Sequence, residues 1–140
     1  MLLMSLLDTG SPIEKFLMGL CEVQNKTLKK GATLSVVQVC ILHDLLQAEK
    51  LFEQGKSKSR EVPLVHIQER YNLERYIVSR NAVSLSNKII RDRGMRAGKR
   101  EGKGWVKSAA LQDSPDDRLK AIVFTTKGRK IAEMIFSIRR

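Results

Sequence analysis

Apolar residues in the first half of the chain recur every three or four positions, a spacing typical of amphipathic helices. The pattern predicts a first helix over residues 11–31, because Ser11 can cap its start. A second helix is expected to begin at Thr33 or Ser35, and Gly55 is its natural stop. The first half of the chain therefore predicts two long helices.

The middle of the chain predicts two further helices joined by a tight turn. A short helix is expected over residues 63–71, after a short extended piece at Val62–Leu64, and a longer helix begins near Glu74. Apolar positions of the longer helix follow steps of four, three and four and predict one buried stripe: Val78, Ala82, Leu85 and Ile89. Its opposite face is polar and basic, so residues 63–90 are predicted to be a helix-turn-helix.

The last third of the chain predicts a β-hairpin followed by a helix. Two β-rich stretches lie at residues 104–111 and 119–124, and the polar turn 112–117 separates them. A hairpin directly after a helix-turn-helix is a wing, here assigned to residues 104–125. With a final helix over 127–140, we predict an α+β, mostly α fold. It is a single winged helix-turn-helix domain over residues 1–140, with flanking N- and C-terminal helices.

The net charge of +11 is concentrated in the middle of the chain. Residues 1–55 hold 5 basic and 6 acidic side chains, residues 56–107 hold 14 and 5, and residues 108–140 hold 7 and 4. This distribution is expected if the near-neutral residues 1–55 pack or dimerise while the basic residues 56–107 bind nucleic acid. The alternative is a basic protein with no particular partner.

The densest positive charge lies between Lys88 and Lys107. This segment has eight Lys or Arg residues against two acids, together with four glycines. It is too charged and too Gly-rich to form a core of its own, but its row of cations would attract a polyphosphate. We interpret residues 91–103 as a basic extension of a DNA-binding surface, either ordered or folding on DNA.

Other functional classes find no support in the sequence. Cys21 and Cys40 form no disulfide framework and lack zinc-ligand spacing. Because both lie on apolar stripes, we expect buried free thiols, with a redox-sensing thiol as the alternative. Asp116 and Asp117 lack a third metal ligand at suitable spacing, and no catalytic triad or phosphate-binding loop is recognisable. We therefore predict no enzyme, catalytic residue, metal, cofactor or small-molecule effector.

The sequence also lacks features of a membrane protein. No run approaches the roughly 20 apolar residues that a membrane-spanning helix needs. The apolar start at residues 1–7 is short and has no basic residues before it, unlike a signal peptide. We expect a soluble, cytoplasmic, nucleoid-associated protein without a membrane partner.

Four short motifs lie in an order that one known family shares. They are LERYIVSR at residues 73–80, GWV at 104–106, DDR at 116–118 and FTTKG at 124–128. In this order they resemble the recognition-helix entry, first wing strand, wing and next-helix entry of the MarR-type winged helix-turn-helix regulators of bacteria and archaea. The likeness covers roughly residues 33–135, and it implies a DNA-binding regulator.

The sequence departs from that family in two places. Leu85 lies 19 positions before Gly104, whereas family members pass from recognition helix to wing within a few residues. The basic segment is thus largely an insertion or a helix extension. The chain also stops soon after the final helix begins, so this helix would supply only part of the family's dimer interface. We expect any homodimer to be built from residues 11–30 with 128–140.

The predicted recognition helix supplies the candidate base contacts, because side chains of its first two turns reach the major groove. Arg75 is expected to bond a guanine, and Ser79 is expected to contact a base or a phosphate. Arg80 lies one position further round the helix than Ser79, so it is expected to contact a phosphate. Tyr76 would stack or bond a phosphate, or else pack against the preceding helix.

Affinity is expected to come mainly from contacts with phosphates. The residues expected to make them are Lys88, Arg91, Arg93, Arg96, Lys99, Arg100, Lys103 and, on the wing, Arg118. The competing interpretation of the helix is that Arg75 and Arg80 are solvated charges paired with Glu69 or Glu74.

The leading prediction is a sequence-specific regulator of transcription that binds double-stranded DNA. A winged-helix replication, partition or nucleoid protein is the first alternative. A protein-interaction module with an acidic partner is the second.

Overall fold

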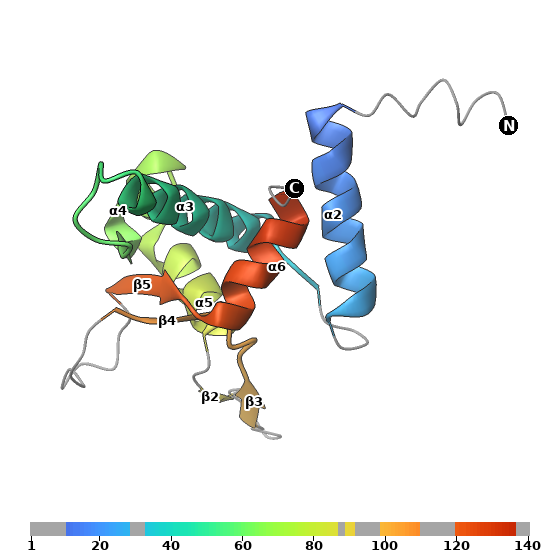
Figure 1. Cartoon of the computed structure of the whole chain (residues 1–140). Coiled ribbons are helices and arrows are strands. Elements are labelled where there is room, and N and C mark those ends of the chain that lie inside the picture. Colours follow the sequence, from blue (N-terminus) through green and yellow to red (C-terminus); the bar gives the residue numbers. More distant parts are fainter. Residues whose placement is uncertain (1–10, 29–32, 87–88, 92–98, 110–119, 137–140) are drawn as a thin grey trace, which may run out of the picture. The chain divides into compact units, whose positions relative to one another are not determined.

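The computed structural model describes residues 11–28, 33–86, 89–91, 99–109 and 120–136. Within them the chain forms five helices and five short strands (Figure 1). The expected α+β, mostly α class is confirmed. The chain divides into two compact units, residues 35–129 and residues 1–34 with 130–140, and each is described by itself.

The longest helix, α3 (Val36–Glu53), begins where sequence rules place it. The Ser35 hydroxyl accepts the Gln38 amide hydrogen at 3.1 Å, and the Gln38 side chain accepts the Ser35 amide hydrogen at 3.2 Å. This reciprocal pair satisfies two backbone donors that a helix start leaves open. After α3, Gly55 adopts a φ of 73°, a conformation that glycine reaches without steric cost.

Two shorter helices follow α3 and pack on it. The chain passes through strand β1 (Val62–Pro63) into α4 (Leu64–Arg70), turns, and continues as α5 (Arg75–Leu85). Asn72 makes the turn with a φ of 53°, a left-handed conformation that asparagine tolerates better than most residues. The predicted extended piece, short helix, turn and longer helix are all present.

The predicted end of the longer helix was wrong. The helix ends at Leu85, and Ile89 lies in strand β2 (Ile89–Arg91), not on a helical stripe. Ser86 stops the helix by adopting extended backbone, and its hydroxyl donates to the Val83 carbonyl at 2.7 Å. A serine that bonds to nearby backbone competes with helix continuation.

A three-stranded antiparallel sheet completes this unit, in the order β1–β5–β4. Strand β4 (Val106–Ser108) pairs with β5 (Ala121–Phe124), and β5 pairs with β1. Strands β4 and β5 are shorter than the stretches 104–111 and 119–124 predicted for them. Residues 110–119, which connect them, lie outside the described part. Figure 1 shows this sheet beside α3, α4 and α5.

The core of the unit is aliphatic apart from one large aromatic residue. Trp105 is 1% exposed, and the sheet contributes fully or nearly buried Val106 and Ile122. The helices contribute Ile41, Leu42, Leu45, Ile67, Val78, Ala82 and Leu85. Burial of these side chains is the main force holding α5 in place.

The start of α6 (Thr126–Phe136) is fixed against Trp105. The Thr125 hydroxyl accepts the Gly128 amide hydrogen at 3.1 Å and donates to the Gly104 carbonyl at 2.8 Å. A side chain at Gly128 would overlap the Trp105 carbonyl oxygen, so glycine is required by close packing.

The second unit contains α2 (Pro12–Lys26) and the later part of α6. Ser11 caps α2 as predicted, by accepting the Glu14 amide hydrogen at 3.2 Å. The helix ends at Lys26, earlier than expected, and Gly31 lies outside the described residues. The rings of Phe16 and Phe136 stack with centroids 5.4 Å apart.

The expectation that Cys21 is buried was wrong, and Cys40 is only partly buried. One side of α2 packs on α6, where Gly19 closely approaches the Ile135 carbonyl. The other side of α2 leaves Ile13 71% exposed and Leu17 52% exposed, and Cys21 lies on this side. A single packed face cannot cover apolar residues all round a helix.

Candidate nucleic-acid interface

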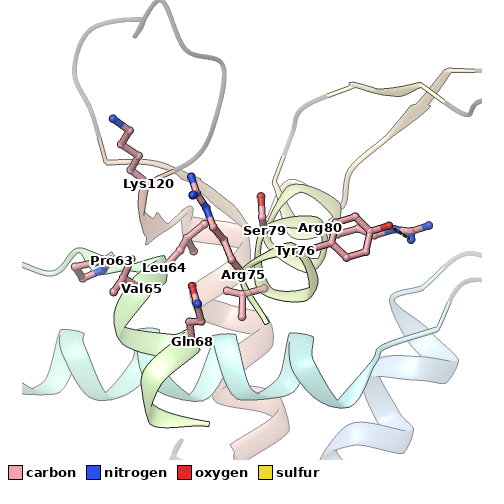
Figure 2. A pocket seen from close by; sticks show the side chains of 10 residues that line it. Pro63, Leu64, Val65, Gln68, Arg75, Tyr76, Ser79, Arg80 and Lys120 are labelled. Atoms are coloured by element: carbon pink, nitrogen blue, oxygen red, sulfur yellow. Dashed lines mark hydrogen bonds between the residues drawn. The ribbon is translucent and has the colours of Figure 1, made fainter. Parts of the chain in front are cut away.

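The four residues predicted on the recognition helix lie together on the outward side of α5. Arg75, Tyr76 and Arg80 are exposed, and Ser79 is half-buried. Figure 2 shows the side chains of Arg75 and Ser79 directed to one side, while Tyr76 and Arg80 lie next to each other on the other. The buried residues of α5 are Val78, Ala82 and Leu85, so these polar residues occupy the remaining face.

Arg80 is oriented by a neighbour one turn away. Its Nη1 donates to the Tyr76 hydroxyl at 2.8 Å, and its guanidinium carbon lies 5.8 Å from the Tyr76 ring centroid. Tyr76 is 65% exposed, so it does not pack away against the preceding helix. Side chains four residues apart are neighbours on a helix, and this contact limits the freedom of the arginine.

No acidic side chain of the described residues forms an ion pair with the two arginines of α5, Arg75 and Arg80. The interpretation that Glu69 or Glu74 pairs with them is therefore not supported by the geometry.

A concave surface of about 1130 Å³ adjoins this face of α5. Pro63, Leu64 and Val65, at the start of α4, form its apolar part. Lys120, just before β5, adds a cation beside Arg75 (Figure 2). The surface thus combines an apolar floor with a cationic rim.

Six residues of this surface were not predicted as site residues from the sequence: Pro63, Leu64, Val65, Gln68, Val78 and Lys120. Val65 is 58% exposed, an unusual position for a β-branched apolar residue near charged groups. Lys120 is distant in sequence from α5, and only the pairing of β5 with β1 brings it near Arg75. No local sequence pattern could have identified it.

The start of α3 anchors α5. The Ser35 hydroxyl donates to the Asn81 side-chain oxygen at 2.7 Å, and the Asn81 amide donates to the Ile77 carbonyl at 2.8 Å. The serine that caps α3 therefore also fixes a residue in the middle of α5.

A buried carboxylate anchors α4. Asp44 of α3 is 6% exposed, and its Oδ1 accepts the Tyr71 hydroxyl hydrogen at 2.7 Å. Arg70 Nε lies 3.4 Å from the same oxygen. Burial and the bond to Asp44 raise the pKa of Tyr71 to about 12, so the phenol stays protonated at neutral pH. This cluster holds the end of α4 immediately before the turn to α5.

The basic segment contains a two-stranded ribbon. Strand β2 pairs antiparallel with β3 (Lys99–Glu101), and Arg91 is opposite Lys99. Beyond β3 the chain returns to the end of α5, where the Lys103 amide donates to the Ser84 carbonyl at 2.9 Å. The Trp105 amide donates to the Leu85 carbonyl at 2.8 Å. The chain that leaves β3 is therefore hydrogen-bonded to the end of α5.

The remaining predicted contacts are described only in part. Lys103 is half-buried, and its Nζ lies 3.5 Å from the Ser84 hydroxyl, so it lies at the end of α5. Arg91, Lys99 and Arg100 belong to the ribbon strands. Lys88, Arg93, Arg96 and Arg118 lie outside the described residues, as do Asp116 and Asp117.

Other chemistry finds little support among the described residues. No group of three or more His, Cys, Asp or Glu side chains there could hold a metal ion. Burial, and then the charge of Asp44, raise the pKa of the Cys40 thiol, which disfavours the reactive thiolate. None of the helices in the described part is long and apolar enough to span a membrane.

Comparison with known protein families, with curated proteins and with solved structures finds no match to this chain.

Proposed function

We propose that this protein is a sequence-specific regulator of transcription that binds double-stranded DNA. In this proposal the unit 35–129 is a winged helix-turn-helix of the MarR-like type that the sequence motifs resemble. Helix α5 is the recognition helix, and β4 and β5 belong to the wing. A cytoplasmic, nucleoid-associated location follows from the same proposal.

The main support is the outward face of α5. It presents two arginines that no described carboxylate neutralises, with a serine between them, and Lys120 adds a third cation nearby. A helix with this face fits the width of the DNA major groove. Arg75 would pair with a guanine edge, and Arg80, held by Tyr76, would contact a phosphate.

The basic ribbon gives independent support. Its paired backbone carries Arg91, Lys99 and Arg100 on two neighbouring strands. Contact of these residues with DNA phosphates would add affinity that falls with salt. The ribbon would then extend the DNA-binding surface from the end of α5.

Selection from a random duplex library tests the function. A preferred sequence should emerge and should be bound about a thousandfold or more tighter than random duplex. Arg75→Gln should cost about 1–3 kcal/mol and relax preference at one base position, because a bidentate contact is lost. Lys56→Gln, which removes an exposed charge away from α5, is the matched control.

The alternatives give different outcomes in the same assay. Tight binding without sequence preference would favour a replication, partition or nucleoid protein. Failure to bind duplex DNA even at low salt would reject DNA binding and favour an interaction module for an acidic protein.

A homodimer is part of the proposal. Helix α2 has an exposed apolar side, with Ile13, Leu17 and Met18 all more than half exposed. A second copy of the same helix would cover this side through a two-fold interface.

A further inference from the structure

A second concave surface, of about 460 Å³, lies within the unit 35–129 and shares no lining residue with the surface beside α5. The end of α3 and the loop after it form one wall. The outer face of β4 and β5 and the first turn of α6 form the other walls. We call this surface the rear cavity.

Three cations face the rear cavity without an acidic partner. Lys58 and Arg60 come from the loop after α3, and Lys107 comes from β4. All three are exposed, and none is in an ion pair with a described residue. The Arg60 guanidinium carbon lies 4.3 Å from the centroid of the Phe52 ring, a contact that orients its charge.

The single acid of the cavity lining is already neutralised. Glu49 is 4% exposed, and both of its oxygens accept hydrogen bonds from Arg129, at 2.6 and 2.7 Å. Such a two-point pair between guanidinium and carboxylate is strong and geometrically fixed. Within the described part of the chain, the cavity lining therefore holds three positive charges that no carboxylate pairs with.

Hydrogen-bond donors lie beside these cations. The Ser59 hydroxyl accepts the Glu61 amide hydrogen at 3.1 Å, which leaves its own proton free to donate. Thr126 begins α6, and although the Gly128 amide donates to the Thr125 hydroxyl, the amides of Thr126 and Lys127 precede the first hydrogen bond within the helix. These donors suit an oxyanion. A phosphate has more acceptor oxygens than a carboxylate, so it can use more of these donors at once.

We propose that the rear cavity binds the phosphate group of a small phosphorylated metabolite. Its volume lies within the usual range for small-ligand sites, about 300–1,000 Å³. Lys58, Arg60 and Lys107 supply the charge, and Ser59 and Thr126 supply hydrogen bonds. This proposal does not depend on the DNA-binding function proposed above, because the two surfaces are separate.

The test uses inorganic pyrophosphate and the full chain at low ionic strength. Calorimetric titration should show one site per chain with a dissociation constant below about 1 mM. The triple variant Lys58→Gln, Arg60→Gln, Lys107→Gln should lose about tenfold or more in affinity, because charged hydrogen bonds are lost.

A charge-matched triple variant separates this site from general electrostatics. Arg75→Gln, Arg80→Gln, Lys120→Gln removes the same charge from the surface beside α5. It should leave pyrophosphate affinity within about twofold of the unaltered chain, a change well below 1 kcal/mol. Equal losses in both triples would overturn the proposal, as would the absence of binding to the unaltered chain.

Two further measurements identify the source of the phosphate. Amide resonances of Ser59, Thr126 and Lys127 should shift on titration of the unaltered chain, a readout that needs no variant. The triple variant of Lys58, Arg60 and Lys107 should bind duplex DNA as tightly as the unaltered chain does. If it instead loses duplex binding as strongly as the triple variant of Arg75, Arg80 and Lys120, the cavity is a DNA contact and the metabolite proposal fails.

Discussion

Asn72, the residue between α4 and α5, has the only positive φ of any described residue other than glycine, at 53°. A left-handed conformation costs an ordinary residue about 1–2 kcal/mol, and glycine and asparagine tolerate it best. Asn72→Val should therefore lower the free energy of unfolding by about 1–2 kcal/mol, as measured by urea denaturation.

Asn72→Gly is the control, because glycine adopts this φ without strain. It should leave the free energy of unfolding within about 1 kcal/mol of the unaltered chain. Equal destabilisation by valine and glycine would show that the asparagine side chain, and not its backbone conformation, is what the turn requires.

Tyr71 connects α4 to the buried carboxylate of Asp44 through a 2.7 Å hydrogen bond. Tyr71→Phe leaves this carboxylate without its closest donor and should lower the free energy of unfolding by about 1–3 kcal/mol near neutral pH. Tyr76→Phe, at an exposed tyrosine, should change it by less than about 0.5 kcal/mol.

The contribution of Tyr71 should also depend on pH. Its folded pKa is raised to about 12, above the usual value of about 10, so the fold favours the protonated phenol. This stabilisation is complete below about pH 10 and is lost as the pH rises towards 12. The difference in unfolding free energy between the unaltered chain and Tyr71→Phe should shrink over that interval. A constant difference would contradict the assignment.

At the scale of elements, helix starts were predictable, whereas the ends of α2 and α5 were not. The Ser35–Gln38 capping box and Ser11 act through residues within four positions, so the sequence alone reveals them. The end of α5 combines a local cause, the extended backbone of Ser86, with a distant one, because the Trp105 amide donates to the Leu85 carbonyl. Ile89 continues the helical spacing by chance, and strand pairing with β3 overrides it.

The surface beside α5 and the rear cavity show the same limit, because only residues close together in the sequence could be assigned to a site in advance. Arg75, Tyr76, Ser79 and Arg80 were found because one helix holds them at helical spacing. The rear cavity was missed because its cations come from a loop and from a strand that lies almost fifty residues further along the chain. Only strand pairing brings such residues together, and one sequence does not encode that in a local pattern.

The basic segment that contains β2 and β3 leads to a prediction about salt dependence. Each phosphate contact contributes about 0.9 to the slope of log affinity against log salt. The triple variant Arg96→Gln, Lys99→Gln, Arg100→Gln should therefore reduce that slope by up to about 2.7, as measured by duplex titration at several salt concentrations.

A control triple removes the same charge from helices that the proposal keeps away from DNA: Lys15→Gln, Lys26→Gln, Lys50→Gln. This variant should leave the salt slope nearly unchanged. If both triples reduce the slope equally, the ribbon acts only through net charge and makes no contacts of its own.

At the scale of the whole molecule, the remaining question is what covers the outer side of α2. Ile13, Leu17 and Cys21 are spaced four residues apart and form one exposed stripe. A two-fold dimer would bury each of these residues twice. Leu17 is 52% exposed, so a dimer buries about half of it in each copy, and losing Leu17 from both copies would cost about 1.5–3 kcal/mol, or about tenfold to a hundredfold in dimer affinity.

Leu17→Asp should therefore convert a dimer into a monomer in light scattering, and Lys26→Asp, at the exposed end of the same helix, should not. Mild oxidation should link two copies through Cys21, because residues near a two-fold axis meet their own copies and Cys21 lies on the stripe that the dimer would cover. Cys21→Ser should abolish this link, whereas Cys40→Ser, at the less exposed thiol, should keep it. A protein that is monomeric at about 100 μM would contradict the dimer.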